Sequence, residues 1–420
     1  MNVRDLDSAV ESEALAEASQ ERSGAVRVAV AGATGYAGRE LIAILARHPQ
    51  ARIVRLMSSG LKSPSPPAPL PQGGEGRKKA EGRSQSRDAA GGRGSFPIEQ
   101  SHPVLRGLGA RGSRSLRSEP ALSEAKGQGR PHEVSSTLCH ALDLEDLTPS
   151  DVDLVFLATP HETSHEVVPA LVERGLRVID LSGAFRLKDP GAYARWYGIE
   201  HHASGALAEA VYGLPELNAA AIRKAQLVSN PGCYATSIVL ALAPLVEADW
   251  LDADAGIVSD AKSGASGAGR APTEKLHFAE VNENCRAYGL FTHRHIPEML
   301  QALGLEERSF TFTPHLLPIT RGILSTVYAR LRERRAVEEI VALFRDFYGA
   351  APLVRVYDSG LPEIQAVAHT NYADLGFALD LETRRLVVVS TLDNLGKGAA
   401  GQAVENMNLM YGFPRETALR

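Results

Sequence analysis

Cysteine is scarce in this chain, and long apolar runs are absent. Three cysteines, Cys139, Cys233 and Cys285, occur among 420 residues, and their number and spacing suggest neither a disulfide framework nor a zinc site. No apolar stretch approaches the roughly 18 residues of a membrane-spanning helix. The N-terminus is acidic and alanine-rich, unlike a secretory signal. We therefore expect a cytoplasmic protein that binds no metal and contacts no membrane.

A strong charge of either sign is also missing. The net charge is −5, with 23% charged and 44% hydrophobic residues, which is ordinary for a globular protein. This balance gives no reason to expect nucleic-acid binding. The length allows two domains, each with a sizeable core.

A glycine-rich turn follows the first apolar segment. Residues 25–31 predict a buried strand, 39–47 predict a helix, and 52–57 predict a second strand, which together open a doubly wound sheet. Glycines in the intervening turn permit close approach of a phosphate to the helix N-terminus, although such turns also serve as plain connections. We predict that a dinucleotide binds to Gly32, Thr34, Gly35, Tyr36, Ala37 and Gly38.

The end of the second strand indicates which dinucleotide is bound. An acidic residue there would hold the ribose 2′-hydroxyl of NAD. Residues 57–62 instead read Met-Ser-Ser-Gly-Leu-Lys, with hydroxyls and a cation but no carboxylate. We therefore predict NADP and include Ser58 among its contacts.

Residues 61–130 interrupt the folded pattern. They contain 12 Gly, 8 Pro, 10 Ser and one aromatic residue, with 13 Lys or Arg against 6 Asp or Glu. Such a segment cannot bury enough apolar surface to offset its ordering entropy, so we predict a disordered basic insertion. Binding of an acidic partner is the alternative use of its charge. Residues 102–107 have a more protein-like composition and are a candidate ordered island.

Folded patterning resumes with a strand at 152–158. A helix at 164–174 and a strand at 177–181 form a further strand–helix–strand unit. Later strand-like runs have few helices between them, which predicts a mixed or antiparallel sheet in a second domain. These runs lie at 256–260, 310–313, 323–331, 354–357, 366–370, 377–381 and 386–391, before a final alanine-rich helix at 399–410.

Cys233 has the most informative position in the sequence. It follows Pro231 and Gly232, and the apolar run at 238–246 has a helical period, so the thiol lies at or near a helix N-terminus. The unpaired N–H groups and the dipole there favour an anion and lower a thiol pKa from about 8.5. We predict a nucleophile; a small buried hydrophobe is the alternative for any free cysteine.

Two glycine-containing loops and one histidine segment carry further candidate groups. The loops at 262–270 and 393–402 are possible anion sites, unless they are plain connections. The segment 291–298 places two histidines and an arginine beside a proline break, which favours acid–base chemistry. His161 and the pair His201 and His202 are weaker candidates.

Together these motifs resemble the N-acetyl-gamma-glutamyl-phosphate reductases of arginine biosynthesis. The matching segments occur in family order and cover nearly the whole chain except 1–23 and about 61–130. Two departures are the basic insertion and Ala184, where many members have an acidic residue. The segments are GATGYAGREL at 32–41, FLATPHE at 156–162, DLSGAFRL at 180–187, YGLPEL at 212–217, SNPGCYATS at 229–237, KSGASGAGR at 262–270, HRHIPE at 293–298 and NLGKGAAGQA at 394–403.

The resemblance implies an α/β fold in two domains, after an N-terminal extension at 1–23. A Rossmann-type NADP-binding domain would comprise 24–230 and 392–420. A dehydrogenase domain with a mixed sheet, like that of glyceraldehyde-3-phosphate dehydrogenase, would comprise 231–391 and serve catalysis and dimerisation, in a homodimer or homotetramer. The reaction would be NADPH-dependent reduction of N-acetyl-L-glutamyl 5-phosphate to N-acetyl-L-glutamate 5-semialdehyde plus phosphate.

The resemblance and the chemistry of these side chains also suggest roles. Cys233 would attack the acyl carbon and form a thioester, which hydride from NADPH would reduce. His295 would be the general acid/base, with His293 as the second choice. Further cofactor contacts would be Ser263, Gly264, Gly267, Asn394, Gly396 and Lys397. The small acyl-phosphate substrate would bind to Arg186, Asn230, Arg270, His293, Arg294 and Glu298.

Two alternatives remain open at this point. A sister enzyme would use the same chemistry on aspartyl phosphate or on a carrier-bound aminoadipyl phosphate. The aspartyl enzymes usually carry Asn before the cysteine, where this chain has Gly232. A nucleotide-sensing protein on a Rossmann scaffold would catalyse nothing and would have no use for Cys233 and the paired histidines.

Overall fold

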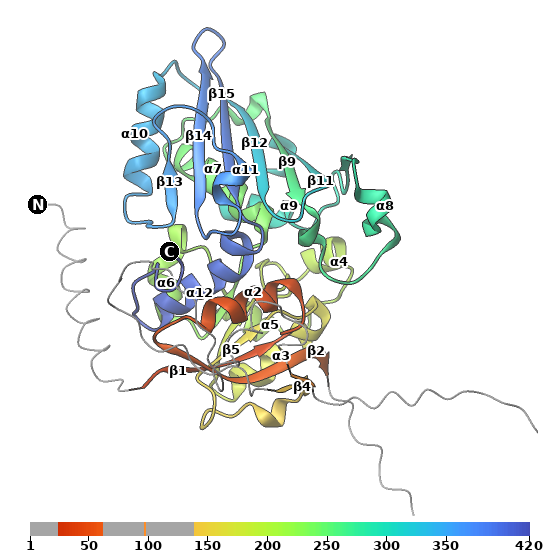
Figure 1. The fold of residues 1–420 in the computed structure, drawn as a ribbon. Helices are drawn as coiled ribbons and strands as arrows, with labels where there is room; N and C mark the ends of the chain where they lie inside the picture. Colours follow the sequence, from red (N-terminus) through yellow and green to blue (C-terminus); the bar gives the residue numbers. More distant parts are fainter. Residues whose placement is uncertain (1–23, 62–95, 98–137) are drawn as a thin grey trace, which may run out of the picture.

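The computed structural model describes residues 24–61, 96–97 and 138–420, which form two α/β units, one above the other in Figure 1. The predicted extension at 1–23 and most of the predicted insertion at 61–130, including the candidate island at 102–107, lie outside the described residues. Within the part of the chain that is described, no helix is long and apolar enough to cross a bilayer.

The first unit is built on a sheet of eight strands. They are β1 (Val26–Ala31), β2 (Ala51–Leu61), β3 (Phe96–Pro97), β4 (Leu138–Leu142), β5 (Leu154–Leu157), β6 (Arg177–Asp180), β7 (Val211–Tyr212) and β8 (Leu227–Ser229). The spatial order is β3-β4-β2-β1-β5-β6-β8-β7, and every neighbouring pair is parallel except β3 and β4. The order reverses between β1 and β5, which is where doubly wound sheets bind ligands.

Helices cover both faces of this sheet, as its apolar strands require. One face is covered by α2 (Tyr36–Leu45), α6 (Pro215–Lys224) and α12 (Gly401–Met410). The other is covered by α3 (His161–Glu173), α4 (Ala192–Tyr197) and α5 (Ser204–Glu209). All of α12 is buried, so the last helix of the chain completes the core of the first unit. The predicted doubly wound sheet is confirmed.

The second unit contains a mixed sheet of seven strands, also as predicted. They are β9 (Ile257–Gly264), β10 (Arg286–Ala287), β11 (Phe310–Leu317), β12 (Ile323–Arg330), β13 (Val354–Val356), β14 (Ala373–Asp380) and β15 (Arg385–Leu392). The order is β10-β11-β9-β12-β15-β14-β13, with parallel pairs only at β9–β11 and β13–β14.

The helix α7 (Cys233–Glu247) joins the two units. It begins directly after β8 of the first sheet but packs beneath the second, with α9 (Ile296–Leu303) and α10 (Val337–Phe347). The Oγ atom of Ser237 lies 2.9 Å from that of Ser325 and 3.0 Å from that of Ser390, which fixes α7 on β12 and β15. The first residue of α7 therefore lies between the units.

One predicted strand, 366–370, is wrong. The chain forms a short helix there, α11 (Ile364–Val367), and His369 has a left-handed φ of 63°, which ends any extended run. A short apolar run does not distinguish strand from helix by its periodicity. The remaining short helix, α8 (Phe278–Val281), lies in the connection between β9 and β10.

Candidate active site

Cys233 is the first residue of α7, as its sequence position predicts. The thiol is half-buried, and Gly398 lies so close that a side chain there would come within 2.9 Å of the Cys233 Cβ. Burial raises the thiol pKa to about 11, against the positive charge of Arg186 and the backbone N–H of Tyr234, which lower it. The expected low pKa is therefore wrong: desolvation exceeds the effect of the helix N-terminus. The thiol needs a base to become a nucleophile.

His295, the predicted base, lies beside the turn that precedes Cys233. It precedes α9 and is buried, and its Nε2 lies 2.3 Å from the point that a Cβ on Gly232 would occupy. The imidazole thus rests against the residue immediately before Cys233. Burial and the neighbouring His293, Arg186 and Arg294 hold the pKa of His295 well below its usual value, so the ring is neutral at neutral pH. A neutral imidazole can accept a proton from a thiol.

Glu298 binds the turn before the cysteine. Its carboxylate is fully buried, and Oε1 accepts the backbone N–H of Gly232 at 2.7 Å and the hydroxyl of Tyr212 at 2.9 Å. Glu298 Oε2 lies 3.4 Å from Arg186. The predicted substrate contact is therefore corrected: this carboxylate is occupied by the protein and holds the turn before Cys233.

Arg186 lies in the centre of the site. Its Nε donates to the carbonyl of Asn230 at 2.8 Å, and a terminal nitrogen donates to the carbonyl of Leu181 at 2.9 Å. The other terminal nitrogen lies 3.5 Å from His295 Nε2. Burial lowers the pKa of Arg186, but the charge of Glu298 and smaller contributions from Tyr197, Tyr212 and Asp180 together raise it by more, so the guanidinium stays charged. Arg186 remains a candidate for binding an anionic part of a substrate.

His293 and Arg294 differ in their surroundings. His293 Nδ1 accepts the backbone N–H of His295 at 3.1 Å, and its ring packs against Tyr234 and Phe312. Burial lowers its pKa to about 4. This contact holds the backbone of His295, whose ring is the one that lies against Gly232. Arg294 is exposed beside both histidines and remains a candidate for the substrate.

The glycine turn between β1 and α2 has the shape that a bound phosphate needs. Gly32 has φ of 80°, and a Cβ on it would lie 2.1 Å from the carbonyl oxygen of Ala158. A Cβ on Gly38 would lie 2.1 Å from the carbonyl oxygen of Gly32. Bare backbone is therefore required here. Gly35, Tyr36 and Ala37 form the start of α2, with Tyr36 exposed. The turn fits a dinucleotide phosphate at the switch point.

Two arginines converge on Thr34 of this turn. Arg39 Nε donates to its carbonyl at 3.1 Å, and Arg270 donates to the same oxygen at 2.9 Å. The backbone N–H of Ala33 donates to the carbonyl of Met57, so the end of β2, where Ser58 follows, adjoins the turn. Arg270, predicted for the substrate, contacts the glycine turn of the first unit, and its substrate contact stays a prediction.

The other predicted loop residues mainly hold the loops together. Asn394 accepts the backbone N–H of Gly322 at 2.8 Å and donates to Ser266 at 2.9 Å. Ser263 is buried and Gly264 packs against the backbone of 320–321, while Gly267 is exposed. Gly396 approaches the carbonyl of Thr370, where a Cβ would lie at 2.2 Å. These contacts order the loop that faces Thr34.

Two predicted contacts are corrected by the structure. Lys397 is fully buried and pairs with Glu216 at 2.9 Å and Glu405 at 2.5 Å, so its ammonium is already neutralised inside the protein. Asn230 donates to the carbonyl of Ala399 and accepts from Asn406. Its amide joins the turn before Cys233 to the start of α12. We withdraw Lys397 from the cofactor contacts and Asn230 from the substrate contacts.

Several contributing residues were missed in the sequence. Tyr212 lies within the YGLPEL segment, but nothing local shows that its hydroxyl reaches Glu298. Arg321 pairs with Glu40 of α2 at 2.9 Å and with Asp393 at 2.8 Å, and so joins the two units. Arg415 joins Glu216 and Glu405 around Lys397. These partners are far apart in sequence, so no spacing rule finds them.

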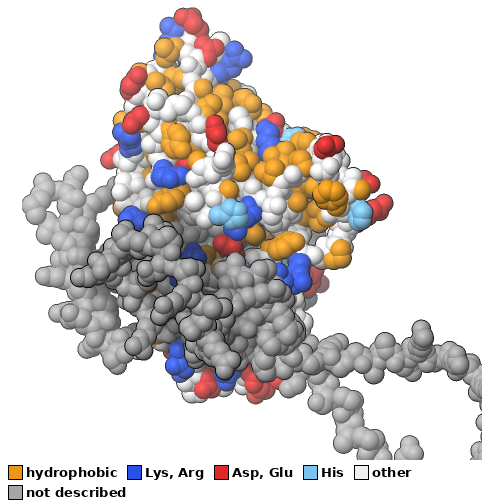
Figure 2. Space-filling model, in the orientation of Figure 1, with side chains coloured by type: hydrophobic (Ala, Val, Ile, Leu, Met, Phe, Trp, Pro, Cys, Tyr) orange, Lys and Arg blue, Asp and Glu red, His pale blue; other side chains and the backbone are white. Residues whose placement is uncertain are grey.

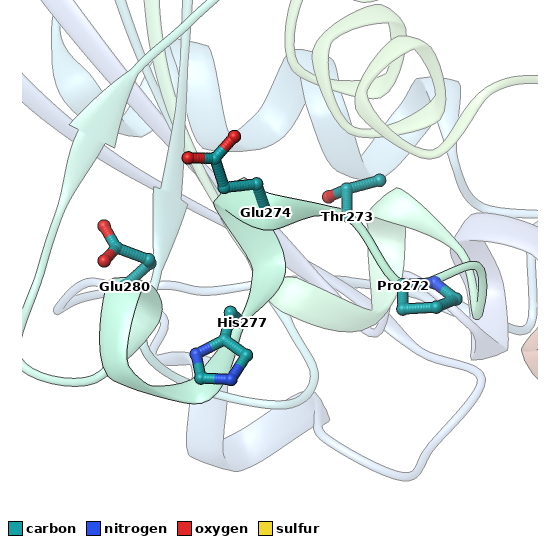
Figure 3. Close-up of a pocket in the computed structure, with 5 residues that line it drawn as sticks. All are labelled: Pro272, Thr273, Glu274, His277 and Glu280. Atoms are coloured by element: carbon teal, nitrogen blue, oxygen red, sulfur yellow. The ribbon is translucent and has the colours of Figure 1, made fainter.

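A surface cavity of about 440 Å³ is lined by Pro272, Thr273, Glu274, His277 and Glu280 (Figure 3). In the close-up these side chains do not converge on one point: the ring of His277 points away from the carboxylate of Glu274. None of the predicted site residues lines the cavity. Nor do the described ranges 24–61, 96–97 and 138–420 contain a group of three or more His, Cys, Asp or Glu that could hold a metal.

The fold and the cysteine–histidine site define a class, the semialdehyde dehydrogenases. The family model "Semialdehyde dehydrogenase, NAD binding domain" matches residues 27–75 and 100–225, and "Semialdehyde dehydrogenase, dimerisation domain" matches 233–394. Aspartate semialdehyde dehydrogenase II from Vibrio cholerae has a TM-score of 0.58 at 16% identity, covering 92% of this chain and 98% of that chain. The aspartate semialdehyde dehydrogenase from Candida albicans, solved with NADP, also has a TM-score of 0.58, at 16% identity, covering 93% of this chain and 99% of that chain.

Closer relatives in sequence are N-acetyl-gamma-glutamyl-phosphate reductases. The reductase of Pelotomaculum thermopropionicum is 43% identical over 94% of this chain and 98% of its own length. The reductase of Symbiobacterium thermophilum is 41% identical over 94% of this chain and 97% of its own length. The reductase of Geobacillus thermodenitrificans is 49% identical over 67% of this chain and 82% of its own length. The chain belongs to the N-acetyl-gamma-glutamyl-phosphate reductase family, and the predicted resemblance is confirmed.

Proposed function

We propose that this chain reduces N-acetyl-L-glutamyl 5-phosphate to N-acetyl-L-glutamate 5-semialdehyde and phosphate in arginine biosynthesis. The observation that carries the proposal is the neutral imidazole of His295 against Gly232, immediately before the thiol of Cys233. Membership of a family whose relatives bear the name of this reaction supports the substrate. A nucleotide sensor would have no use for this pairing.

The chemistry proceeds through a covalent bond to the cysteine. His295 takes the thiol proton of Cys233 as sulfur attacks the acyl carbon, and the C–O bond to phosphate breaks, with phosphate leaving with the bonding pair. A nicotinamide dinucleotide held at the turn of Gly32, Gly35 and Gly38 would supply the hydride that reduces the carbon of this thioester. The His295 imidazolium gives its proton to the developing oxygen anion. It then takes that proton back as the C–S bond breaks, with the bonding pair leaving on sulfur and the aldehyde forming, and it passes the proton to the Cys233 thiolate, which restores the thiol.

We assign NADP as the cofactor rather than NAD. A nicotinamide dinucleotide is supported by the matching NAD-binding family model. The preference for NADP is supported by the absence of a carboxylate at 57–62 and by the two guanidinium groups at Thr34. Burial and the charge of Arg270 both lower the pKa of Arg39. A ribose 2′-phosphate between these cations would relieve their repulsion.

We further propose a homodimer, paired through the open face of the second sheet. The helices α7, α9 and α10 cover the opposite face. On the open face Tyr328 lies opposite both Val258 and Val387 in the strand register, and Tyr328 and Val258 are exposed. Figure 2 shows hydrophobic side chains gathered over these strands in the upper unit. The dimerisation-domain family model covers this sheet.

The domain division at 24–230 with 392–420, and at 231–391, also stands as a proposal. It is supported by α12, which is buried in the first core, and by the close of the second sheet at Leu392. A cytoplasmic location is supported by the three cysteines, all of which are free thiols. A reducing compartment keeps thiols reduced, including that of the proposed nucleophile Cys233.

The proposed reaction is tested in reverse, as phosphate-dependent reduction of NADP by a panel of semialdehydes. We expect kcat/KM for N-acetyl-L-glutamate 5-semialdehyde to exceed that for aspartate 4-semialdehyde by at least about a hundredfold. No reaction should occur without phosphate or arsenate. Preference for aspartate semialdehyde would identify the sister enzyme, and NADPH binding without turnover would identify a sensor.

A further inference from the structure

His161 and Tyr197 form a polar pair that the mechanism above does not use. His161 is the first residue of α3, and Tyr197 is the last residue of α4. Their rings meet edge to face with centroids 5.4 Å apart. The Nε2 atom of His161 and the hydroxyl of Tyr197 are both buried, and neither makes a hydrogen bond of good geometry within the described residues. Buried polar atoms are rarely left unpaired, so this pair points to a ligand.

The backbone makes room for the pair. A Cβ on Gly183 would lie 2.2 Å from Tyr197 Cε1 and 2.6 Å from its hydroxyl, so the phenol packs on bare backbone. Gly183 follows β6, and Arg186 is three residues further along. Burial raises the pKa of Tyr197 to about 12, while the charge of Arg186 and a weak side-chain interaction with its guanidinium act in the opposite direction. The phenol therefore lies near Arg186 and keeps its proton at neutral pH.

The pair also lies beside the cofactor turn. His161 is three residues after Ala158, whose carbonyl oxygen faces Gly32. Arg186, on the other side, reaches within 3.5 Å of His295. Through Tyr197 the pair therefore adjoins Arg186, which itself reaches the cysteine–histidine site.

The chemistry of this position favours an uncharged group. The Oε1 atom of Glu162 lies 3.4 Å from His161 Nε2, and its negative charge disfavours a carboxylate or phosphate there. A phenol hydroxyl donates one hydrogen bond, and an unprotonated imidazole nitrogen accepts one. A secondary amide offers the matching set, a carbonyl oxygen and an N–H. Arg186 and Arg294 are left to the anionic groups.

We propose that Tyr197 and His161 bind the acetamido group of the substrate, the phenol donating to its carbonyl and the imidazole accepting from its N–H. The proposal rests on the proposed function and names the part of the substrate that these two residues read. It also explains selection of an N-acetylated substrate: without the acetamido group, both buried atoms stay unpaired, which costs binding.

The test compares two aldehydes in the phosphate-dependent assay with the full-length enzyme. One is N-acetyl-L-glutamate 5-semialdehyde, and the other is glutarate semialdehyde, which lacks only the acetamido group. For Tyr197→Phe and His161→Leu we expect kcat/KM for the acetylated aldehyde to fall about tenfold, mainly through KM. Activity with glutarate semialdehyde should change less than about threefold. His161→Gln, which keeps an acceptor, should restore part of the preference.

Controls separate this proposal from the reaction itself. His202→Gln changes a histidine whose side chain is 69% exposed and should leave both activities unchanged. If the parent enzyme oxidises the acetylated aldehyde and both variants keep its preference over glutarate semialdehyde, the acetamido assignment is overturned while the function stands. Equal losses with both aldehydes would show a merely structural role and overturn it too. A parent enzyme inactive with the acetylated aldehyde would overturn both proposals.

Discussion

Gly232 has no side chain, and the imidazole of His295 occupies the space that one would fill. Position 232 thus controls how closely the base approaches the nucleophile's turn. Gly232→Ala should displace the imidazole and lower kcat by about a hundredfold, because small displacements of catalytic groups cost that much. Steady-state kinetics beside NADPH titration will show this. Gly205→Ala, whose Cβ meets nothing within 4 Å, is the matched control. A Gly232→Ala enzyme whose kcat lies within threefold of the parent value would contradict the claim that this position sets the approach of His295.

The protonation of His295 sets the pH dependence of the reaction. Because the pKa of His295 lies well below 6.5, the imidazole stays neutral as pH falls through 6.5 and is lost as a base only at lower pH. The thiol pKa of about 11 keeps Cys233 protonated over the same range. We expect kcat/KM to be flat from about pH 6.5 to 9, with its acid limb below that range. An acid limb above pH 7 would refute the assignment of His295 as the base. A His295→Asn variant whose kcat/KM lies within tenfold of the parent value would refute it too.

The sequence pointed to the proposed reacting residues, but it did not show which residues hold them in place. Cys233 and His295 lie beside turn-forming residues at helix starts, which local patterns predict. The partners of Lys397, Asn230 and Glu298 come from distant segments, so their roles in internal pairs required the structure. The expected low pKa of the Cys233 thiol is wrong for the same reason. Desolvation depends on everything packed around Cys233, including Gly398, and not on its local sequence.

The loop at 262–270 links the two units by placing Arg270 on the turn before α2. If Arg39 and Arg270 bind the 2′-phosphate, Arg270→Ala should raise KM for NADPH by about tenfold and change KM for NADH little. The ratio of kcat/KM for the two cofactors gives the measurement. Arg308→Ala removes an exposed arginine that pairs only locally, with Glu306, and is the control. An equal loss with both cofactors would contradict the assignment.

Most elements of the fold could be predicted because their patterns are strong. The strand–turn–helix at 26–45 combines a buried β pattern with glycines, and the long strands β11 and β12 alternate buried and partly exposed residues. The placement of α7 could not be predicted. Its sequence follows a strand of the first sheet, but its apolar surface packs under the second, which only the tertiary structure shows.

The assembly of the whole molecule depends on the open face of the second sheet. Tyr328→Asp places a charge in the row formed with Val258 and Val387, where pairing of two copies would bury it. We expect light scattering with size exclusion to show a shift from dimer to monomer. Leu381→Asp changes a residue that is 56% exposed beyond the end of β14 and is the control. A variant at position 328 that remains dimeric at micromolar concentration would place the interface elsewhere.

The central claim is that Cys233 carries the acyl group during the reaction, and mass spectrometry tests it most directly. The enzyme is mixed with N-acetyl-L-glutamyl 5-phosphate in the absence of NADPH, quenched in acid and digested. We predict an N-acetylglutamyl adduct on the peptide containing Cys233, and this adduct should disappear when NADPH is added before the quench. No adduct should form on Cys285, nor in Cys233→Ala, which should also lose activity by at least about a thousandfold. An enzyme that releases phosphate and forms aldehyde without any adduct at Cys233, or whose Cys233→Ala variant stays within tenfold of the parent, would contradict it.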